Sequence, residues 1–179
     1  MKVRADHEAV ERRLDAVDAV PVERVRQVDT YYDAPHRDFA ESDEALRIRR
    51  ETPAGGGESA RVTYKGPLVD RVSKTREEVE TGVDDGDRLG EILTHLGFDP
   101  AATVEKSRVR YAVDGYTVTL DEVAGLGEFV EVEREVEAGD VESAQAGAFD
   151  LVERLGLDPD DGIRTSYLGL LLDAESDGS

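Results

Sequence analysis

The stretch KSRVRYAVDGYTVTLDEV, residues 106–123, decides the fold class. Two runs of alternating side chains, Lys106 to Val113 and Tyr116 to Val123, flank the dipeptide Asp114-Gly115. Such a dipeptide between alternating runs is a strong signal for a β-hairpin, because both turn positions need a positive φ angle. Successive side chains of a strand point to opposite faces of the sheet. The hairpin therefore has one largely apolar face and one charged face.

The same alternation predicts further strands along the chain. We expect them at Met1 to Arg4, Val25 to Tyr32, Ala45 to Glu51, Ala60 to Lys65, Lys74 to Glu80 and Glu128 to Val136, which makes about eight strands, mostly antiparallel. Helical spacing and stop signals predict helices at Asp6 to Val20, Asp87 to Leu96, Glu142 to Leu155 and Tyr167 to Leu172. No linker or repeat divides the chain, which predicts one domain over residues 1–179 with a short acidic tail at 174–179.

The charged faces of these strands separate bases from acids. An ordinary antiparallel sheet would expose such a face to solvent. The chain, however, carries a net charge of -20, and its basic residues comprise 18 arginines and only four lysines. Arginines and three of the four lysines gather on some strands, and carboxylates gather on others. This segregation favours an α+β fold: a closed, eight-stranded, mainly antiparallel β-barrel with a charged lumen and helices packed outside.

Composition excludes several classes of function. With 42 acidic residues against 22 basic ones, the chain repels phosphate backbones, so we expect no nucleic-acid partner. The absence of cysteine excludes disulfides and thiolate sites. No apolar run reaches the roughly 20 residues that span a bilayer, so we expect no membrane partner and a cytoplasmic monomer or homodimer. Acidic residues spread through a foldable chain are typical of proteins from salt-loving archaea.

A lumen lined by both signs of charge has a definite chemical use. Guanidinium and ammonium groups bind phosphate oxygens. Carboxylates bind hard divalent cations, and these cations bridge phosphates. The charged faces therefore predict a ligand with a chain of phosphates, bound together with Mg²⁺ or Mn²⁺. Gly55-Gly56-Gly57 precedes a predicted strand rather than a helix, so it does not offer a phosphate loop instead.

Seven motifs in a fixed order carry a resemblance to a known family. They are DTYYD (29–33), LRIR (46–49), TYKGP (63–67), REEVE (76–80), EKSR (105–108), LDEV (120–123) and GLGEFVEVE (125–133). With them the sequence resembles the CYTH superfamily of triphosphate tunnel enzymes, from Lys2 to about Leu171. The lysine-glycine-proline run and the glycine-rich GLGEFVEVE run are most similar to the class IV adenylyl cyclase branch.

The resemblance implies a set of site residues. The basic residues that would bind the triphosphate are Lys2, Arg47, Arg49, Lys65, Lys106 and Arg108. The carboxylates that would hold metal are Asp121, Glu131 and Glu133, with Glu78 and Glu80 as further ligands. In triphosphatase relatives, residues at the positions of Lys65 and Tyr31 help to activate the attacking water. Tyr31 also has a plain interpretation as a packing residue, and Glu80 as an ion-pair partner.

Three functions remain open at this point. The first is a class IV adenylyl cyclase, which converts ATP to cyclic AMP and pyrophosphate. The second is a triphosphatase acting on tripolyphosphate, thiamine triphosphate or a nucleoside triphosphate. The third is a non-catalytic binder of polyphosphate or nucleotide. The family's Glu-x-Glu-x-Lys motif matches Lys2, but its two glutamates would fall before Met1. We expect an upstream extension that restores them to raise turnover.

Overall fold

The structure is a computed structural model that describes residues 1–70, 75–134 and 140–177. The chain forms two compact units. Unit 1 consists of residues 1–25 and 106–179, and unit 2 consists of residues 26–105. Strands β2 (Val20–Asp33) and β6 (Asp99–Val113) each begin in one unit and end in the other. The prediction of a single domain over the whole chain stays a prediction.

The described strands form one eight-stranded sheet, in the order β1-β8-β7-β6-β2-β3-β4-β5. The remaining strands are β1 (Lys2–Arg4), β3 (Ala45–Pro53), β4 (Ser59–Asp70), β5 (Thr75–Val83), β7 (Tyr116–Val123) and β8 (Gly127–Glu133). Every strand pair with a described register is antiparallel. The α+β class is confirmed. The closed barrel is not confirmed, because the order begins at β1 and ends at β5.

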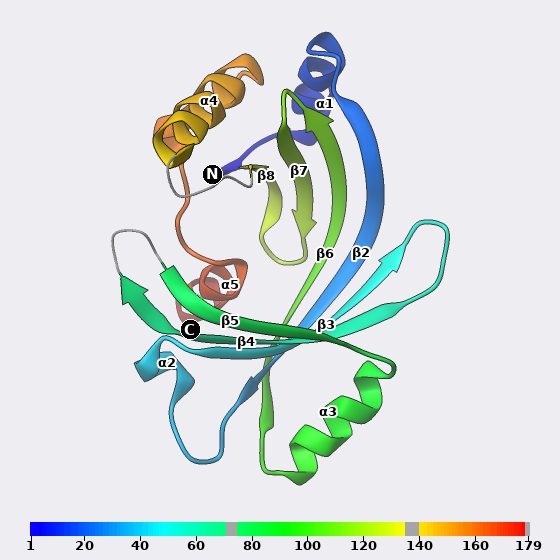
Figure 1. The fold of residues 1–179 in the computed structure, drawn as a ribbon, viewed down its shortest axis with the longest axis vertical. Helices are drawn as coiled ribbons and strands as arrows, with labels where there is room; N and C mark the ends of the chain where they lie inside the picture. The colour runs from blue at the N-terminus through cyan, green and yellow to red at the C-terminus, as the bar shows by residue number, and fades with distance from the viewer. Residues whose placement is uncertain (71–74, 135–139, 178–179) are drawn as a thin grey trace. The chain divides into compact units, whose positions relative to one another are not determined.

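The hairpin that the sequence predicted in unit 1 is present. Val113 pairs with Tyr116, and the turn residues Asp114 and Gly115 have φ angles of 52° and 77°. The apolar face of this part of the sheet, which includes Val118 and Val130, packs against two helices (Figure 1). These helices are α1 (His7–Ala16) and α4 (Val141–Arg154). Burying this face leaves the other face of the same strands for the charged side chains.

Several elements differ in extent from the sequence prediction. Helix α1 is capped by Asp6, as expected, but ends at Ala16 rather than Val20. Asp18 adopts a left-handed φ of 55°, which ends the helix and leads the chain directly into β2. Helix α5 (Tyr167–Asp177) is longer than predicted, and the 3₁₀ helix η2 (Pro159–Asp161) was not predicted. In the parts of the chain that the structure describes, no helix has the length and apolar character to cross a membrane.

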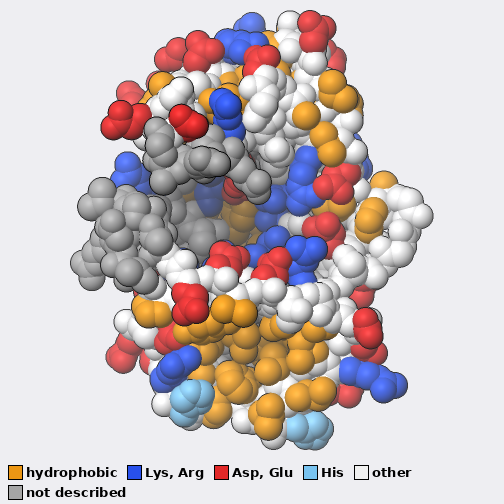
Figure 2. Space-filling view, viewed as in Figure 1, with side chains coloured by type: hydrophobic (Ala, Val, Ile, Leu, Met, Phe, Trp, Pro, Cys, Tyr) orange, Lys and Arg blue, Asp and Glu red, His pale blue; other side chains and the backbone are white. Residues whose placement is uncertain are grey.

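Unit 2 contains the β3–β4 hairpin and two helices, α2 (Phe39–Ser42) and α3 (Gly86–His95). The predicted strand Lys74 to Glu80 corresponds to β5, although Lys74 itself lies outside the described residues, as do the last two residues of the predicted strand Glu128 to Val136. Val79, Ile92 and Leu96 are all more than half exposed. Figure 2 shows hydrophobic side chains gathered on the surface near α3 of unit 2. The surface of unit 2 is therefore not uniformly acidic.

Candidate functional site

The charged face of unit 1 is built by cross-strand register. Arg108 on β6 lies opposite Asp121 on β7, and Thr119 on β7 lies opposite Glu131 on β8. Glu131 in turn lies opposite Lys2 on β1. Residues that are directly opposite in an antiparallel pair place their side chains on the same face of the sheet. The sequence prediction that these bases and acids share one face is confirmed for unit 1.

Asp121 is the centre of this face. Its carboxylate is fully buried and accepts two parallel hydrogen bonds from Arg108, from Nε at 2.7 Å and from Nη2 at 2.6 Å. The same Nη2 also donates to Glu131 at 3.0 Å, and the Lys106 ammonium lies 3.8 Å from Asp121 Oδ2. Burial acts to raise the pKa of Asp121, but the hydrogen bonds from Arg108 and the charge of Lys106 outweigh it and hold the pKa below its ordinary value.

Tyr167, the first residue of α5, completes this cluster. Its hydroxyl donates to Asp121 Oδ2 at 2.9 Å. The ammonium groups of Lys2 and Lys106 lie 4.2 Å and 4.9 Å from the centroid of its ring. The Lys2 ammonium also donates to the carbonyl of Thr165, two residues earlier. Sequence reasoning gave Tyr167 no role, because strand alternation says nothing about a helical residue that packs on the charged face.

The charged face of unit 2 is centred on a second buried carboxylate, Asp29. Arg49 donates to it from Nε at 2.6 Å and from Nη2 at 2.7 Å, and Arg47 donates from Nη1 at 3.4 Å. In the sequence, Asp29 is the first residue of the DTYYD motif, but the pattern indicated no function for it. Asp29 lies two residues before Tyr31 and so on the same face of the strand. Because Tyr31 was a predicted site residue, this spacing was the signal that could have placed Asp29 in the site as well.

Lys65, Glu78 and Glu80 lie on two neighbouring strands of unit 2. The Lys65 ammonium is 3.3 Å from Glu78, and the partners are about one-third and two-fifths exposed. Glu80 accepts hydrogen bonds of 2.8 Å from both Thr63 and Arg61. The Thr63 hydrogen bond lowers the pKa of Glu80, with further help from Arg61. Both carboxylates therefore already have partners in unit 2.

Tyr31 lies on the strand that carries Asp29. Burial raises the pKa of its phenol, and the nearby charge of Asp29 raises it further, while Arg47 acts in the opposite direction. A raised pKa keeps the phenol protonated at neutral pH. Tyr31 is thus suited to donate a hydrogen bond and poorly suited to accept a proton from water.

The five carboxylates expected to hold metal are divided between the units. Asp121, Glu131 and Glu133 belong to unit 1, and Glu78 and Glu80 belong to unit 2. Among the described residues, no three carboxylate or histidine side chains form a group that could hold a metal ion. Mg²⁺ usually needs only one or two carboxylates, with phosphate oxygens and water completing its octahedron. Glu131 and Glu133 lie two residues apart on β8 and so on one face of the strand, where they could supply these two carboxylates.

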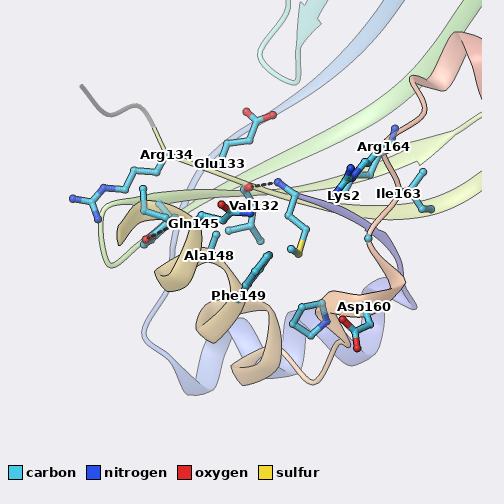
Figure 3. Close-up of a pocket in the computed structure, with 15 residues that line it drawn as sticks. Lys2, Val132, Glu133, Arg134, Gln145, Ala148, Phe149, Asp160, Ile163 and Arg164 are labelled. Atoms are coloured by element: carbon cyan, nitrogen blue, oxygen red, sulfur yellow. Dashed lines mark hydrogen bonds between the residues drawn. The ribbon is translucent and has the colours of Figure 1, made fainter. Parts of the chain in front are cut away.

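A pocket of about 670 Å³ lies in unit 1 beside the charged face. Figure 3 shows Ala148 and Phe149 of α4 on one wall, with Lys2 and Arg164 on another side. Lys2 and Glu133 line this pocket and also belong to the charged face. The pocket therefore combines an apolar wall with access to basic side chains.

The family of the chain follows from comparison with known proteins. The sequence profile of the CYTH domain matches residues 1–167. A Methanocaldococcus jannaschii protein named "Putative adenylate cyclase MJ0240" is 37% identical over 145 residues, which is 80% of each protein. The solved structure of the PH1819 protein from Pyrococcus horikoshii is 38% identical and covers 97% of each chain, with a TM-score of 0.83. The chain belongs to the CYTH domain family.

A more distant structure shares the fold. It comes from Hippeastrum and is described in the words "Putative adenylyl cyclase HpAC1", with "a dominant triphophatase activity". The Hippeastrum protein is 18% identical to this chain, with a TM-score of 0.67. The match covers 97% of this chain and 93% of the Hippeastrum chain. At that identity the likeness is one of fold alone.

Proposed function

We propose that the chain is a metal-dependent enzyme of the class IV adenylyl cyclase type, which converts ATP to cyclic AMP and pyrophosphate. The observation that carries the proposal is the cluster around Asp121. In a chain with four lysines, two of them, Lys2 and Lys106, lie together with Arg108 on one face of unit 1. The names of the relatives support the same activity.

Arg108 is proposed to bind a phosphate group in unit 1. Its described hydrogen bonds use Nε and Nη2, while the Nη1 end of the guanidinium carries two more N–H donors. The fork to Asp121 fixes the plane of the guanidinium without consuming these donors. Arginine held in this way suits phosphate oxygens, because its donors are rigid and always charged.

Arg47 is proposed to bind a phosphate group from unit 2. Within the described residues, its Nε is buried and has no hydrogen-bond partner. A buried donor without an acceptor costs free energy, of about 1–3 kcal/mol. A ligand oxygen, directly or through a rotation of the guanidinium, would relieve this cost. Arg49 and Lys65 are proposed to bind phosphate from the same face.

Mg²⁺ or Mn²⁺ is proposed to enter with the substrate, held by Glu131 and Glu133. When bound, the ion would offset the negative charge of the phosphates. Asp121 is not assigned to the metal, because both of its oxygens accept hydrogen bonds from Arg108 and one also accepts from Tyr167. Glu78 and Glu80 remain additional ligands only if they exchange their present partners.

The chemical step of a cyclase joins the ribose 3′-oxygen of ATP to the α-phosphorus and breaks the bond to pyrophosphate, and the hydroxyl proton passes to the solvent or to the departing pyrophosphate. The basic side chains of the charged faces would bind the phosphates and orient the α-phosphorus. The pocket beside Lys2, with its wall of Ala148 and Phe149, favours a triphosphate that carries an organic group. Apolar walls with a few polar groups are typical of sites for such ligands.

The alternative is a triphosphatase, in which water attacks the terminal phosphorus. The activity named for the Hippeastrum protein favours this candidate. It would use the same phosphate contacts and differ in the position of the nucleophile. Because the pKa of Tyr31 is raised by burial, Tyr31 would orient the water by a hydrogen bond. Lys65 would help to activate the same water.

Product identification tests the proposal. The protein is incubated with ATP, and separately with tripolyphosphate, with Mg²⁺ or Mn²⁺ in high salt, and the products are followed by ³¹P NMR and chromatography. Cyclic AMP with pyrophosphate is the expected result. Orthophosphate from either substrate supports the triphosphatase instead, and binding without turnover supports the non-catalytic binder. Lys106→Ala should reduce turnover, whereas Arg88→Ala, at a highly exposed position of α3, should not.

A further inference from the structure

We infer that Tyr167 is a positioning residue that holds the ammonium groups of Lys2 and Lys106 together on the charged face of unit 1. The inference rests on the proposed function, since it concerns the binding of phosphate by these two lysines. Tyr167 lies on α5, whereas the two lysines lie on β1 and β6. One aromatic ring thus links strands that are far apart in the sequence.

The contacts of the ring carry the inference. Lys2 Nζ lies 4.2 Å and Lys106 Nζ lies 4.9 Å from the ring centroid, both within the range of a cation–π interaction. Tyr167 and Lys106 are both more than nine-tenths buried. Attraction between a cation and a ring is stronger where water is excluded. The ring therefore attracts both ammonium groups, although like charges repel each other.

Tyr167 is itself fixed from three sides. The ring of Phe129 packs edge-on against it, with centroids 5.1 Å apart and an interplanar angle of 68°. The Tyr167 hydroxyl donates to Asp121, and burial raises the pKa of this hydroxyl, so it remains a donor at all ordinary pH values. Ser166, the residue before α5, accepts a hydrogen bond from Gly169 N at 3.0 Å, which fixes the start of the helix at Tyr167. A ring held this firmly can fix the more flexible lysine chains.

The expected benefit is preorganisation. A lysine side chain has four rotatable bonds, and fixing it at the moment of binding costs conformational entropy. When the ring already holds both ammonium groups, that cost is met on folding rather than on binding, and the ligand binds more tightly. The ring, and not the hydroxyl, is the part of Tyr167 that makes this contribution.

The small number of lysines makes a direct test feasible. With lysine labelled by ¹³C and ¹⁵N, the chain gives only four lysine ε-CH₂ signals, which are assigned with Lys2→Arg and Lys106→Arg. In the unmodified protein, the signals of Lys2 and Lys106 should be shifted upfield by the ring current of Tyr167. Tyr167→Phe should keep these shifts, and Tyr167→Leu should remove them.

Tripolyphosphate binding, measured by calorimetry, gives the functional result. Tyr167→Leu should weaken binding about tenfold, and Tyr167→Phe should restore it to within threefold of the unmodified protein. Tyr111→Leu is the control: it removes another tyrosine of unit 1, one that packs against the hydrophobic core and whose hydroxyl donates to Glu11 at 3.4 Å, and it should leave binding unchanged.

Two outcomes would overturn the inference. The first is the absence of ring-current shifts at Lys2 and Lys106 in the unmodified protein, which is decisive even if Tyr167→Leu does not fold. The second is tight tripolyphosphate binding that Tyr167→Leu leaves intact or that Tyr167→Phe fails to restore. If the unmodified protein binds no tripolyphosphate although the shifts are present, the proposed function fails and the positioning contact stands.

Discussion

Arg108 and Asp121 form a buried, two-point ion pair, with Nε and Nη2 of the guanidinium 2.7 Å and 2.6 Å from the two carboxylate oxygens. A buried charge is costly unless a partner offsets it. The pair therefore ties the stability of unit 1 to the orientation of a proposed phosphate-binding arginine. Asp29 and Arg49 repeat the arrangement in unit 2, at 2.6 Å and 2.7 Å.

Asp121→Asn should destabilise the fold by roughly 3–5 kcal/mol, because the amide replaces the carboxylate that pairs with Arg108 at two points and leaves only Glu131 to offset the charge of Arg108. The free energy of unfolding is measured by urea titration in high salt. Asp87→Asn serves as the control, since it removes an ion pair with Arg50 in which the aspartate is highly exposed, and it should cost less than about 1 kcal/mol. Equal losses in the two variants would contradict the role of the buried pair.

Acid should unfold the protein partly through Asp121. Burial acts to raise its pKa, but Arg108 and Lys106 bring the pKa in the folded chain below the unfolded value of about 3.9. A carboxyl of this kind stabilises the fold above its unfolded pKa and loses that contribution as the pH falls through the folded pKa. Stability should therefore fall as the pH drops below about 4.

Comparing the unmodified protein with Asp121→Asn isolates the contribution of Asp121 to the pH dependence of stability. Urea titrations from pH 6 to about pH 2 are run on the unmodified protein and on Asp121→Asn. The variant should be less stable at pH 6 and should lose less stability on acidification. The same acid-induced loss in both proteins would show that Asp121 does not change its pKa on folding.

Glu131→Gln should reduce Mn²⁺-dependent turnover far more than it reduces stability, because a neutral amide is a poor substitute for a metal-binding carboxylate. Glu131 accepts a hydrogen bond from Arg108, so some loss of stability is also expected. Activity is measured as a function of Mn²⁺ concentration, and thermal midpoints are recorded in parallel. Glu122→Gln, at an exposed position of β7, is the control. Normal turnover of Glu131→Gln at low Mn²⁺ would make Glu131 a structural residue.

Local patterns in the sequence predicted most of the strands and the charged side of each strand. The Asp114-Gly115 turn was predictable because its conformation is restricted to few residue types. The early end of α1 was not, since Asp18 in a left-handed conformation has no marker as clear as a glycine. The extension of β6 back to Asp99, and of β2 back to Val20, depends on pairing with other strands rather than on local alternation.

The candidate site was predictable only in part, because local alternation does not show which side chains meet in the folded chain. Strand alternation placed Arg108, Asp121 and Glu131 on one face, and the structure brings them together. Strand alternation could not indicate that both carboxylate oxygens of Asp121 accept hydrogen bonds from Arg108, because hydrogen-bond partners depend on tertiary packing. Tyr167 reaches the same carboxylate from a helix, which no strand pattern describes.

Binding of tripolyphosphate tests the central claim most directly. Calorimetry in high salt compares the unmodified protein with Lys106→Ala from unit 1, Arg47→Ala from unit 2 and the exposed control Arg88→Ala. Each of the first two removes a charge-assisted contact worth roughly 1.5–3 kcal/mol, so affinity should fall at least tenfold, while the control should match the unmodified protein. Affinities within twofold of the unmodified protein for both Lys106→Ala and Arg47→Ala would contradict the assignment of the charged faces to phosphate binding.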